Sequence, residues 1–386
     1  MAKKSTPAEK KVISDLPSKM LDLIIKIDTE KGSTYSAFDD LFLVHNALPE
    51  IDYKKIDLKT KFLNKKIDLP ICISPLTGGE EGLVMFNKII GLIGKTLNIP
   101  IFSGDQIYAI RDLGIPNKDK IIESYRVLRE ESSDAPVIAN LRASDLLFHK
   151  ITPSEVQKCI DMIGADAISF YLSPLIDILL NQSNISYEGI IKKVESIKKE
   201  ISVPIIMKEY TAGLSHDVVR RLWDIGVEMF DVSGYGGTNM CKLVMRKNFS
   251  ASVKQTADPE ITPFDNWGIP QIWSLMDIKM RKENAKVPVI LSGGIRSGDQ
   301  IVKGLICGAD YCGIAFPMVS EIYEDIKYLS EHNLETYLEK IEYEIKITMF
   351  VLGFHNLAEL KESGKNKMVI FGKTLEWMRQ RNLNFN

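Results

Sequence analysis

Short apolar runs recur along the chain and alternate with longer amphipathic stretches. Eight runs are rich in β-branched and aromatic side chains, a composition typical of parallel strands that are covered on both faces. The eight runs are Pro70–Ser74, Pro100–Ser103, Pro136–Asn140, Ala167–Tyr171, Pro204–Lys208, Met229–Ser233, Pro288–Ser292 and Tyr311–Ala315.

Between most of these runs, apolar residues recur every three or four positions, which predicts helices with one buried face. The stretches SEVQKCIDMIG, YEGIIKKVESIKKEI and HDVVRRLWDIG each precede a predicted strand. Gly164, Gly226 and Gly308 follow helical stretches, where a helix end favours a residue that tolerates a positive φ. Strand and helix alternating eight times predict an α/β fold, a (β/α)8 TIM barrel.

The remaining sequence predicts extensions at both ends of this barrel. We expect residues 1–65 to form an N-terminal tail and capping segment, 66–320 the barrel, and 321–386 a helical C-terminal extension. Most predicted strands end in polar or small residues, and the carboxyl ends of the strands form the active-site face of a TIM barrel. This asymmetry favours an enzyme over a structural barrel.

The composition of the chain argues against several classes of binding partner. The 386 residues contain 49 Lys and Arg against 51 Asp and Glu, a net charge of −2, which offers no basic field for nucleic acid. The sequence contains no run of about 18 apolar residues that would predict a membrane helix. No apolar signal region follows MAKKSTPAEKK. The five cysteines are scattered and form no metal-ligand pattern. We expect a cytoplasmic protein with a small-molecule substrate, no bound metal, no membrane contact and no nucleic-acid partner.

Three glycine clusters follow predicted strands: LTGG at 76–79, GYGGT at 234–238 and SGGIRSG at 292–298. Exposed backbone N–H groups in such loops form a concavity that binds anions, and barrels commonly hold phosphate at this face. The clusters predict a phosphate-bearing ligand, with the Thr238 hydroxyl as a further donor. The alternative is that the glycines only permit tight turns.

Lys208, at the end of the fifth run, is a second signal. A lysine that ends an apolar strand is costly unless it meets an anion or an electron-rich acceptor, or extends its ammonium group to solvent. We interpret Lys208 as a cation directed at a cofactor or an oxyanion. Trp267, in FDNWGIPQ, is interpreted as a packed loop anchor.

With these motifs assembled, the chain resembles the type 2, FMN-dependent isopentenyl-diphosphate isomerases. The likeness runs through FDDLFLVHNALPEID, SPLTGG, VIANLRAS, PIIMKEYTAGLS, DVSGYGGTNM, FDNWGIP and LSGGIRSGDQIVKGLICGAD. It implies that FMN is surrounded by Thr77, Gly78, Gly79, Asn140, Lys208, Gly236, Gly237, Thr238, Gly293 and Gly294. To these we add residues of the same strand ends and loops as cofactor-binding candidates: Ser74, Ser103, Ser233, Arg296 and Ala315.

The substrate side departs from that family pattern. Where the family opens with an Arg-Lys…His stretch that binds diphosphate, this chain reads PSKMLDLIIKI, in which Lys19 is the remaining candidate cation. After the second strand the family's Gly-Ser-Gln-Arg is replaced by Gly104, Asp105, Gln106 and Ile107. The sequence VIANLR places Arg142 at the rim.

After the fourth strand the family reads His-Leu-Asn and then Gln-Glu, with the glutamine handling protons and the glutamate binding Mg²⁺. The corresponding residues here are Tyr171, Leu172 and Ser173, followed by Ile176 and Asp177. Isoleucine can neither donate nor accept a proton. The flavin half of the family pattern is therefore kept, whereas the diphosphate half is replaced.

These observations predict an FMN-dependent flavoenzyme with redox or proton-transfer chemistry on another small substrate. We assign Lys208, Tyr171 and Asp177 as catalytic candidates, with Tyr171 as proton donor, and Gln106, Arg142, Tyr171 and Asp177 as substrate contacts. NAD(P)H is a candidate reductant, and family likeness predicts a homo-oligomer.

Three alternatives remain at this stage. One is a genuine isopentenyl-diphosphate isomerase that uses reduced FMN and Mg²⁺, and another is a flavin-binding protein without activity. A hydroxy-acid oxidase ranks low, because it needs a His-Gly-Gly-Arg stretch where this chain has Tyr235, Gly236, Gly237 and Thr238.

Overall fold

The computed structural model describes residues 36–111, 117–181, 185–244, 264, 266–284, 286–328, 330 and 332–385. Lys19 and the rest of PSKMLDLIIKI lie outside these ranges.

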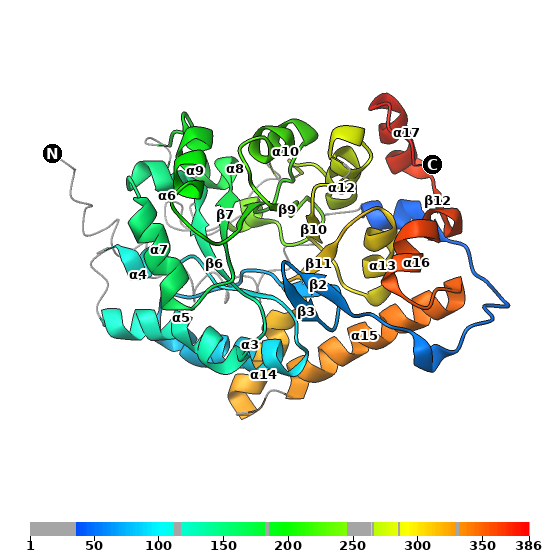
Figure 1. Cartoon of the computed structure of the whole chain (residues 1–386), viewed down its shortest axis with the longest axis horizontal. Helices are drawn as coiled ribbons and strands as arrows, with labels where there is room; N and C mark the ends of the chain where they lie inside the picture. Colours follow the sequence, from blue (N-terminus) through cyan, green and yellow to red (C-terminus); the bar gives the residue numbers. More distant parts are fainter. Residues whose placement is uncertain are drawn as a thin grey trace, which may run out of the picture.

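Eight parallel strands close into a barrel at the centre of the molecule (Figure 1). Each predicted run overlaps one of them, and β6, β7 and β8 extend one or two residues further, so the predicted fold class is confirmed. In barrel order from the first strand they are β4 (Ile71–Ile73), β5 (Ile101–Phe102), β6 (Val137–Arg142), β7 (Ala167–Leu172), β8 (Ile205–Glu209), β9 (Met229–Asp231), β10 (Val289–Ser292) and β11 (Tyr311–Ile314).

Helices surround the barrel and bury their apolar faces against the strands (Figure 1). The capping box of Thr152 and Glu155, with Pro153 at the first helical position, begins α7. Gly164, Gly226 and Gly308 adopt φ of 50°, 90° and 106°, as the sequence predicts. The helices between strands include α3 (Val84–Thr96), α4 (Ile107–Ile110), α5 (Lys118–Ser132), α6 (Ala143–Phe148), α7 (Pro153–Met162), α8 (Pro174–Asn181), α9 (Ile190–Lys198), α10 (His216–Trp223), α12 (Gln271–Lys279) and α13 (Gly298–Ile306).

A hairpin closes the amino-terminal end of the barrel. Strands β2 (Thr60–Phe62) and β3 (Lys65–Ile67) pair antiparallel, and Phe62 and Ile67 are fully buried. They join an apolar cluster with inward residues of the barrel strands, among them Tyr311. Because side chains fill this end, we expect a ligand to bind at the opposite end of the barrel, where the strands have their carboxyl ends.

The C-terminal extension is helical and meets the residues that precede the barrel. It comprises α14 (Pro317–Tyr328), α15 (His332–Leu352), α16 (Leu357–Ser363), β12 (Met368–Ile370) and α17 (Gly372–Gln380). Strand β12 pairs antiparallel with β1 (Leu41–Leu43). The three-part division of the chain at residues 65 and 320 stays a prediction.

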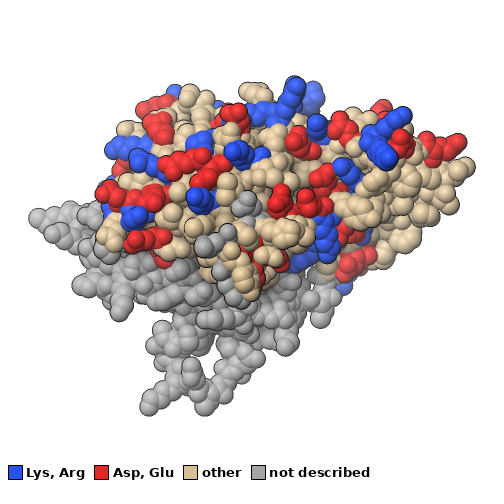
Figure 2. Space-filling model, turned by 90° about the horizontal axis from the view of Figure 1, so that it is seen from below, with Lys and Arg blue, Asp and Glu red and all other residues tan. Residues whose placement is uncertain are grey.

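Basic and acidic side chains are interspersed over the described part of the face shown in Figure 2. This mixture fits the near-zero net charge. No helix among the described residues is both long enough and apolar enough to cross a bilayer.

Candidate active site

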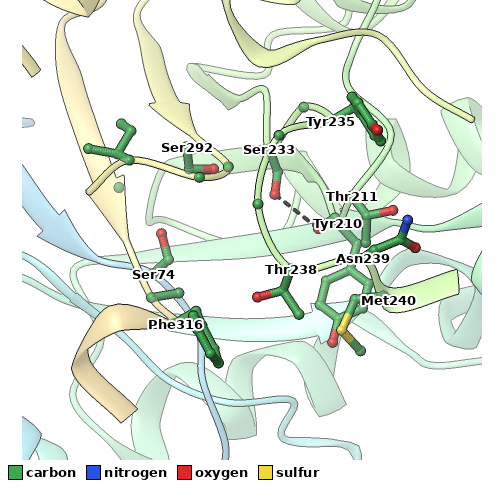
Figure 3. Close-up of a pocket in the computed structure, with 18 of the residues that line it drawn as sticks. Ser74, Tyr210, Thr211, Ser233, Tyr235, Thr238, Asn239, Met240, Ser292 and Phe316 are labelled. Carbon is green, nitrogen blue, oxygen red and sulfur yellow. Dashed lines mark hydrogen bonds between the residues drawn. The ribbon is translucent and has the colours of Figure 1, made fainter. Parts of the chain in front are cut away.

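A cavity opens at the carboxyl ends of β4, β8, β9, β10 and β11, and it encloses about 1020 Å³ of empty space, part of it open to solvent. Ser74 and Ser292 approach it from neighbouring parts of the barrel wall, while Tyr210, Thr238 and Met240 lie on the other side (Figure 3). Ten of the predicted cofactor residues line it: Ser74, Lys208, Ser233, Gly236, Gly237, Thr238, Gly293, Gly294, Arg296 and Ala315.

The loops after β9 and β10 touch each other through glycine backbone. Gly293 and Gly294 have φ of 100° and 79°, values that residues with a side chain rarely adopt. A Cβ on Gly294 would overlap the Gly236 carbonyl, and one on Gly237 would lie 2.6 Å from the Gly294 nitrogen. Only glycine therefore permits this approach, which brings two stretches of backbone to one side of the cavity.

Lys208 reaches the cavity floor from β8, and its side chain is almost completely buried. Its Nζ donates a hydrogen bond to the Glu209 carbonyl at 2.8 Å and lies 3.7 Å from Asp231 Oδ2. Burial raises the pKa of Asp231, although the nearby Lys208 opposes that rise. Ser74, at the end of β4, also lines the cavity, and its hydroxyl is buried without a hydrogen-bond partner among the described residues.

The other five predicted cofactor residues do not line the cavity. Asn140 Oδ1 accepts a hydrogen bond from Ser169 Oγ at 2.6 Å, and Ser103 Oγ donates to the Gly104 carbonyl at 2.9 Å. Gly79 N donates to Ser124 Oγ at 2.9 Å. These residues, together with Thr77 and Gly78, lie at the ends of β4, β5 and β6, where neighbouring side chains fill the space. Their contact with FMN stays a prediction.

Three of the four predicted substrate residues come together in a partly buried network next to the cavity. Arg142 Nε donates to the Tyr171 hydroxyl at 2.9 Å and lies 3.6 Å from Asp177 Oδ1. The Tyr171 hydroxyl donates to Asp105 Oδ2 at 2.7 Å. The Tyr171 ring lies 5.6 Å from that of Tyr210, which lines the cavity. We call Asp105, Arg142, Tyr171 and Asp177 the arginine network.

Asp177 has partners on both carboxylate oxygens. Oδ1 accepts from Ser173 Oγ at 2.8 Å and Oδ2 from the Tyr187 hydroxyl at 2.6 Å, and the side chain is fully buried. No group of three His, Cys, Asp or Glu side chains that suits a metal ion occurs among the described residues.

Gln106, the fourth predicted substrate residue, is separate from this network. Its amide oxygen accepts from Asn140 N at 3.1 Å and its amide nitrogen donates to the Cys159 carbonyl at 3.0 Å. The side chain is fully buried and joins the backbone of β6 to that of α7. A contact of Gln106 with substrate stays a prediction.

Burial shifts the acid–base behaviour of the arginine network. It raises the pKa of Asp105, against the opposing effects of Arg142 and the Tyr171 hydrogen bond, and raises that of Tyr171 well above its ordinary value. Burial also raises the pKa of the adjacent Asp145 to about 7. At neutral pH Tyr171 therefore keeps its proton, which it donates to Asp105.

An apolar wall faces the same cavity. Ile176 is buried against Met240 and Cys241, and those two residues line the cavity. Phe316 lies on the opposite side (Figure 3), where the Arg296 guanidinium carbon is 5.7 Å from its ring centre. The basic residues among the described lining are Lys208 and Arg296.

Sequence reasoning did not assign Tyr210, Met240, Phe316 or Asp231 to the site. Tyr210 follows Lys208 by two positions, so alternation at the strand end was an available signal. Trp267 lines the cavity and is 60% exposed, so its interpretation as a packed anchor is wrong. Its position depends on a contact between distant loops: Ile269 N donates to the Ala212 carbonyl at 2.8 Å.

Comparisons with known proteins agree with this geometry. The chain is 33% identical over 353 residues to isopentenyl-diphosphate delta-isomerase of Thermococcus onnurineus, covering 90% of this chain and 88% of that protein. The enzyme of the same name from Thermococcus kodakarensis matches with the same identity and coverage. The chain belongs to the FMN-dependent isopentenyl-diphosphate delta-isomerase family. The isomerase family was the resemblance predicted from the sequence, and it is confirmed.

Two further matches concern the flavin and the fold. Residues 181–367 of this isomerase-family chain match the FMN-dependent dehydrogenase family. A Pediococcus acidilactici protein assigned as a lactate oxidase superposes with a TM-score of 0.61 at 18% identity, covering 94% of this chain and 93% of its own. At that identity the match shows the barrel alone. Together, these relationships make the chain an FMN-dependent enzyme, an oxidoreductase or an isomerase.

The cavity of this isomerase-family member suits FMN in its chemistry. The glycine loops after β9 and β10 present backbone suited to a phosphate. Ser74, whose hydroxyl has no partner among the described residues, and the buried Lys208 both line the cavity, and each would supply a hydrogen-bond donor to a polar ring system.

Proposed function

We propose that this enzyme holds FMN in the cavity and acts on a small, uncharged and partly apolar substrate rather than on isopentenyl diphosphate. The observation that carries the proposal is the environment of Asp177. Its oxygens accept from Ser173 and Tyr187, and Arg142 lies 3.6 Å away, so Mg²⁺ would have to compete with two hydrogen bonds and a nearby cation for this carboxylate.

The apolar wall supports the same conclusion. Ile176 occupies the position where the family carries a glutamine, and it packs into an apolar cluster with Met240 and Cys241. Recognition of a diphosphate needs several cations in one pocket. Among the described lining residues, Lys208 faces Asp231 and Arg296 lies over Phe316. Arg142, outside the lining, interacts with the carboxylates of Asp105, Asp145 and Asp177.

Each residue then has a defined part in the reaction. FMN, when bound, supplies hydride or electron transfer through its ring system. Lys208 would stabilise negative charge on that ring, and the backbone of Gly293 and Gly294 with the Thr238 hydroxyl would hold the phosphate. Tyr171 would donate a proton, with Arg142 and Asp105 fixing its hydroxyl. Tyr210, Met240 and Trp267 would form the substrate-facing wall.

The experiment has two stages. The purified protein, with FMN added, should show the visible flavin absorbance and retain it after gel filtration. Isopentenyl diphosphate with reduced FMN and Mg²⁺ should give no turnover, while an uncharged probe, 3-methyl-3-buten-1-ol, should perturb the flavin spectrum more than the diphosphate does. Absence of bound flavin would overturn the cofactor assignment.

A second candidate is isopentenyl-diphosphate isomerisation itself. It is favoured by the 33% identity over 90% of the chain to proteins of that name. Turnover of isopentenyl diphosphate in the assay above would establish it and overturn our proposal. NAD(P)H as reductant, a homo-oligomeric state and a cytoplasmic location remain predictions.

A further inference from the structure

A buried ion pair lies beneath the cavity floor. Lys208 and Asp231 are opposite each other in the register of β8 and β9, and they are 4% and 1% exposed. Lys208 Nζ lies 3.7 Å from Asp231 Oδ2, which has no hydrogen-bond partner among the described residues. The other oxygen, Oδ1, accepts from Ser292 Oγ and, at 3.2 Å, from Ser233 N. Asp231 is thus fixed on one side and faces the ammonium on the other.

We propose that Asp231 is a positioning residue that keeps Lys208 charged and its ammonium group at the cavity floor. Burying an ammonium group without a counter-charge is costly, and the group then tends to lose its proton. Asp231 supplies that counter-charge without lining the cavity itself. The inference rests on the proposed contact between Lys208 and FMN.

Two other titratable groups face this pair. Glu209, the next residue on β8, has its pKa raised by burial to about 7, and its carboxylate accepts hydrogen bonds from the backbone of residues 211–213. On β4, burial raises the pKa of the Cys72 thiol well above its usual range. Both groups are present in the wild type and in an Asp231 variant. Cys72 interacts electrostatically with Asp231, and Glu209 with Lys208. The comparison therefore includes the Lys208→Met background, which shows how much of an Asp231 effect does not pass through Lys208.

The test measures FMN dissociation constants by fluorescence between pH 6 and pH 9.5 for wild type, Asp231→Asn, Lys208→Met and the double variant. The ratio of the Asp231→Asn constant to that of wild type should rise at least about fivefold across this range, because the uncompensated ammonium loses its proton at lower pH. In the Lys208→Met background, Asp231→Asn should give a ratio that does not change with pH.

A pH-independent ratio between Asp231→Asn and wild type, with wild type binding FMN, would overturn the inference. Failure of wild type to bind FMN would instead overturn the proposed function.

If Asp231→Asn does not fold by circular dichroism, Ser292→Ala tests the same relationship, because it removes a donor to Asp231 and keeps both charges. This variant should weaken FMN binding about two- to fivefold when Lys208 is present. In the Lys208→Met background the effect should be smaller, limited to the direct loss of a hydroxyl from the cavity lining. An equal effect in both backgrounds would contradict the inference.

Discussion

Tyr171 lies between opposite charges: its hydroxyl donates to Asp105 Oδ2 at 2.7 Å and accepts from Arg142 Nε at 2.9 Å. Asp105 follows β5, whereas Arg142 ends β6 and Tyr171 lies near the end of β7. One hydroxyl therefore links three consecutive strand ends beside the cavity.

Tyr171→Phe should lower the free energy of unfolding by about 1–3 kcal/mol, because it leaves Asp105 and Arg142, two partly buried charged groups, each short of one hydrogen bond. Urea unfolding followed by circular dichroism measures this. Tyr343→Phe is the matched control, since Tyr343 is 58% exposed and should change the free energy by less than about 0.5 kcal/mol. Equal effects of the two variants would contradict the assigned hydrogen bonds.

Asp145, adjacent to the arginine network, should make the free energy of unfolding depend on pH. Burial raises the pKa of Asp145 from 3.8 to about 7, so between these values the folded state holds a proton that the unfolded chain has lost. The free energy of unfolding therefore falls as pH rises through this window and levels off above it. Asp145→Asn should make that fall shallower between about pH 5 and pH 7.

Urea unfolding at several pH values measures the slope. Glu209, whose pKa is also raised by burial to about 7, contributes with the same sign and should leave part of the slope in Asp145→Asn. An unchanged slope in the variant would show that Asp145 does not keep its proton in the folded state.

Gly294→Ala should abolish measurable FMN binding, because the added Cβ overlaps the Gly236 carbonyl at a φ of 79°. Flavin fluorescence titration measures it, with the melting temperature recorded alongside. Gly82→Ala is the control, since a Cβ there has no heavy atom within 4 Å. Normal FMN binding by Gly294→Ala would exclude these loops as the phosphate site.

Ile176→Gln restores the family's residue type, yet it should lower the free energy of unfolding by about 1–3 kcal/mol, because the amide enters an apolar cluster. Ile176→Val should cost about 0.5–1.5 kcal/mol through lost packing alone. Comparing the two by urea unfolding separates polarity from volume. A Gln variant as stable as wild type would indicate a polar partner at this position.

The barrel was predictable because each strand carries its own local signal. Runs such as Pro136–Asn140 are continuous apolar segments of the kind that only a two-sided parallel sheet buries. The glycine loops were predictable for the same reason. Gly293 and Gly294 adopt positive φ values that favour glycine, so the residue type itself indicates the backbone conformation.

Which polar side chains line the cavity was harder to predict from the sequence. Nothing local distinguishes Asn140, which turns to Ser169, from Ser74, which reaches the cavity, because the outcome depends on what neighbouring strands contribute. Trp267 enters the lining through the backbone contact between Ile269 and Ala212, two loops that are distant in the sequence. Long-range packing of this kind has no signature in a single segment.

Residues around the cavity differ in how well they should tolerate substitution. The arginine network consists of charged and polar side chains from several strand ends that hydrogen-bond or pair with one another. Replacing one of them therefore leaves a charged neighbour without its partner. Met240 and Trp267 line the cavity without belonging to that network. Laboratory evolution toward new substrates should therefore accumulate replacements at Met240 and Trp267 and retain Asp105, Arg142, Tyr171 and Asp177.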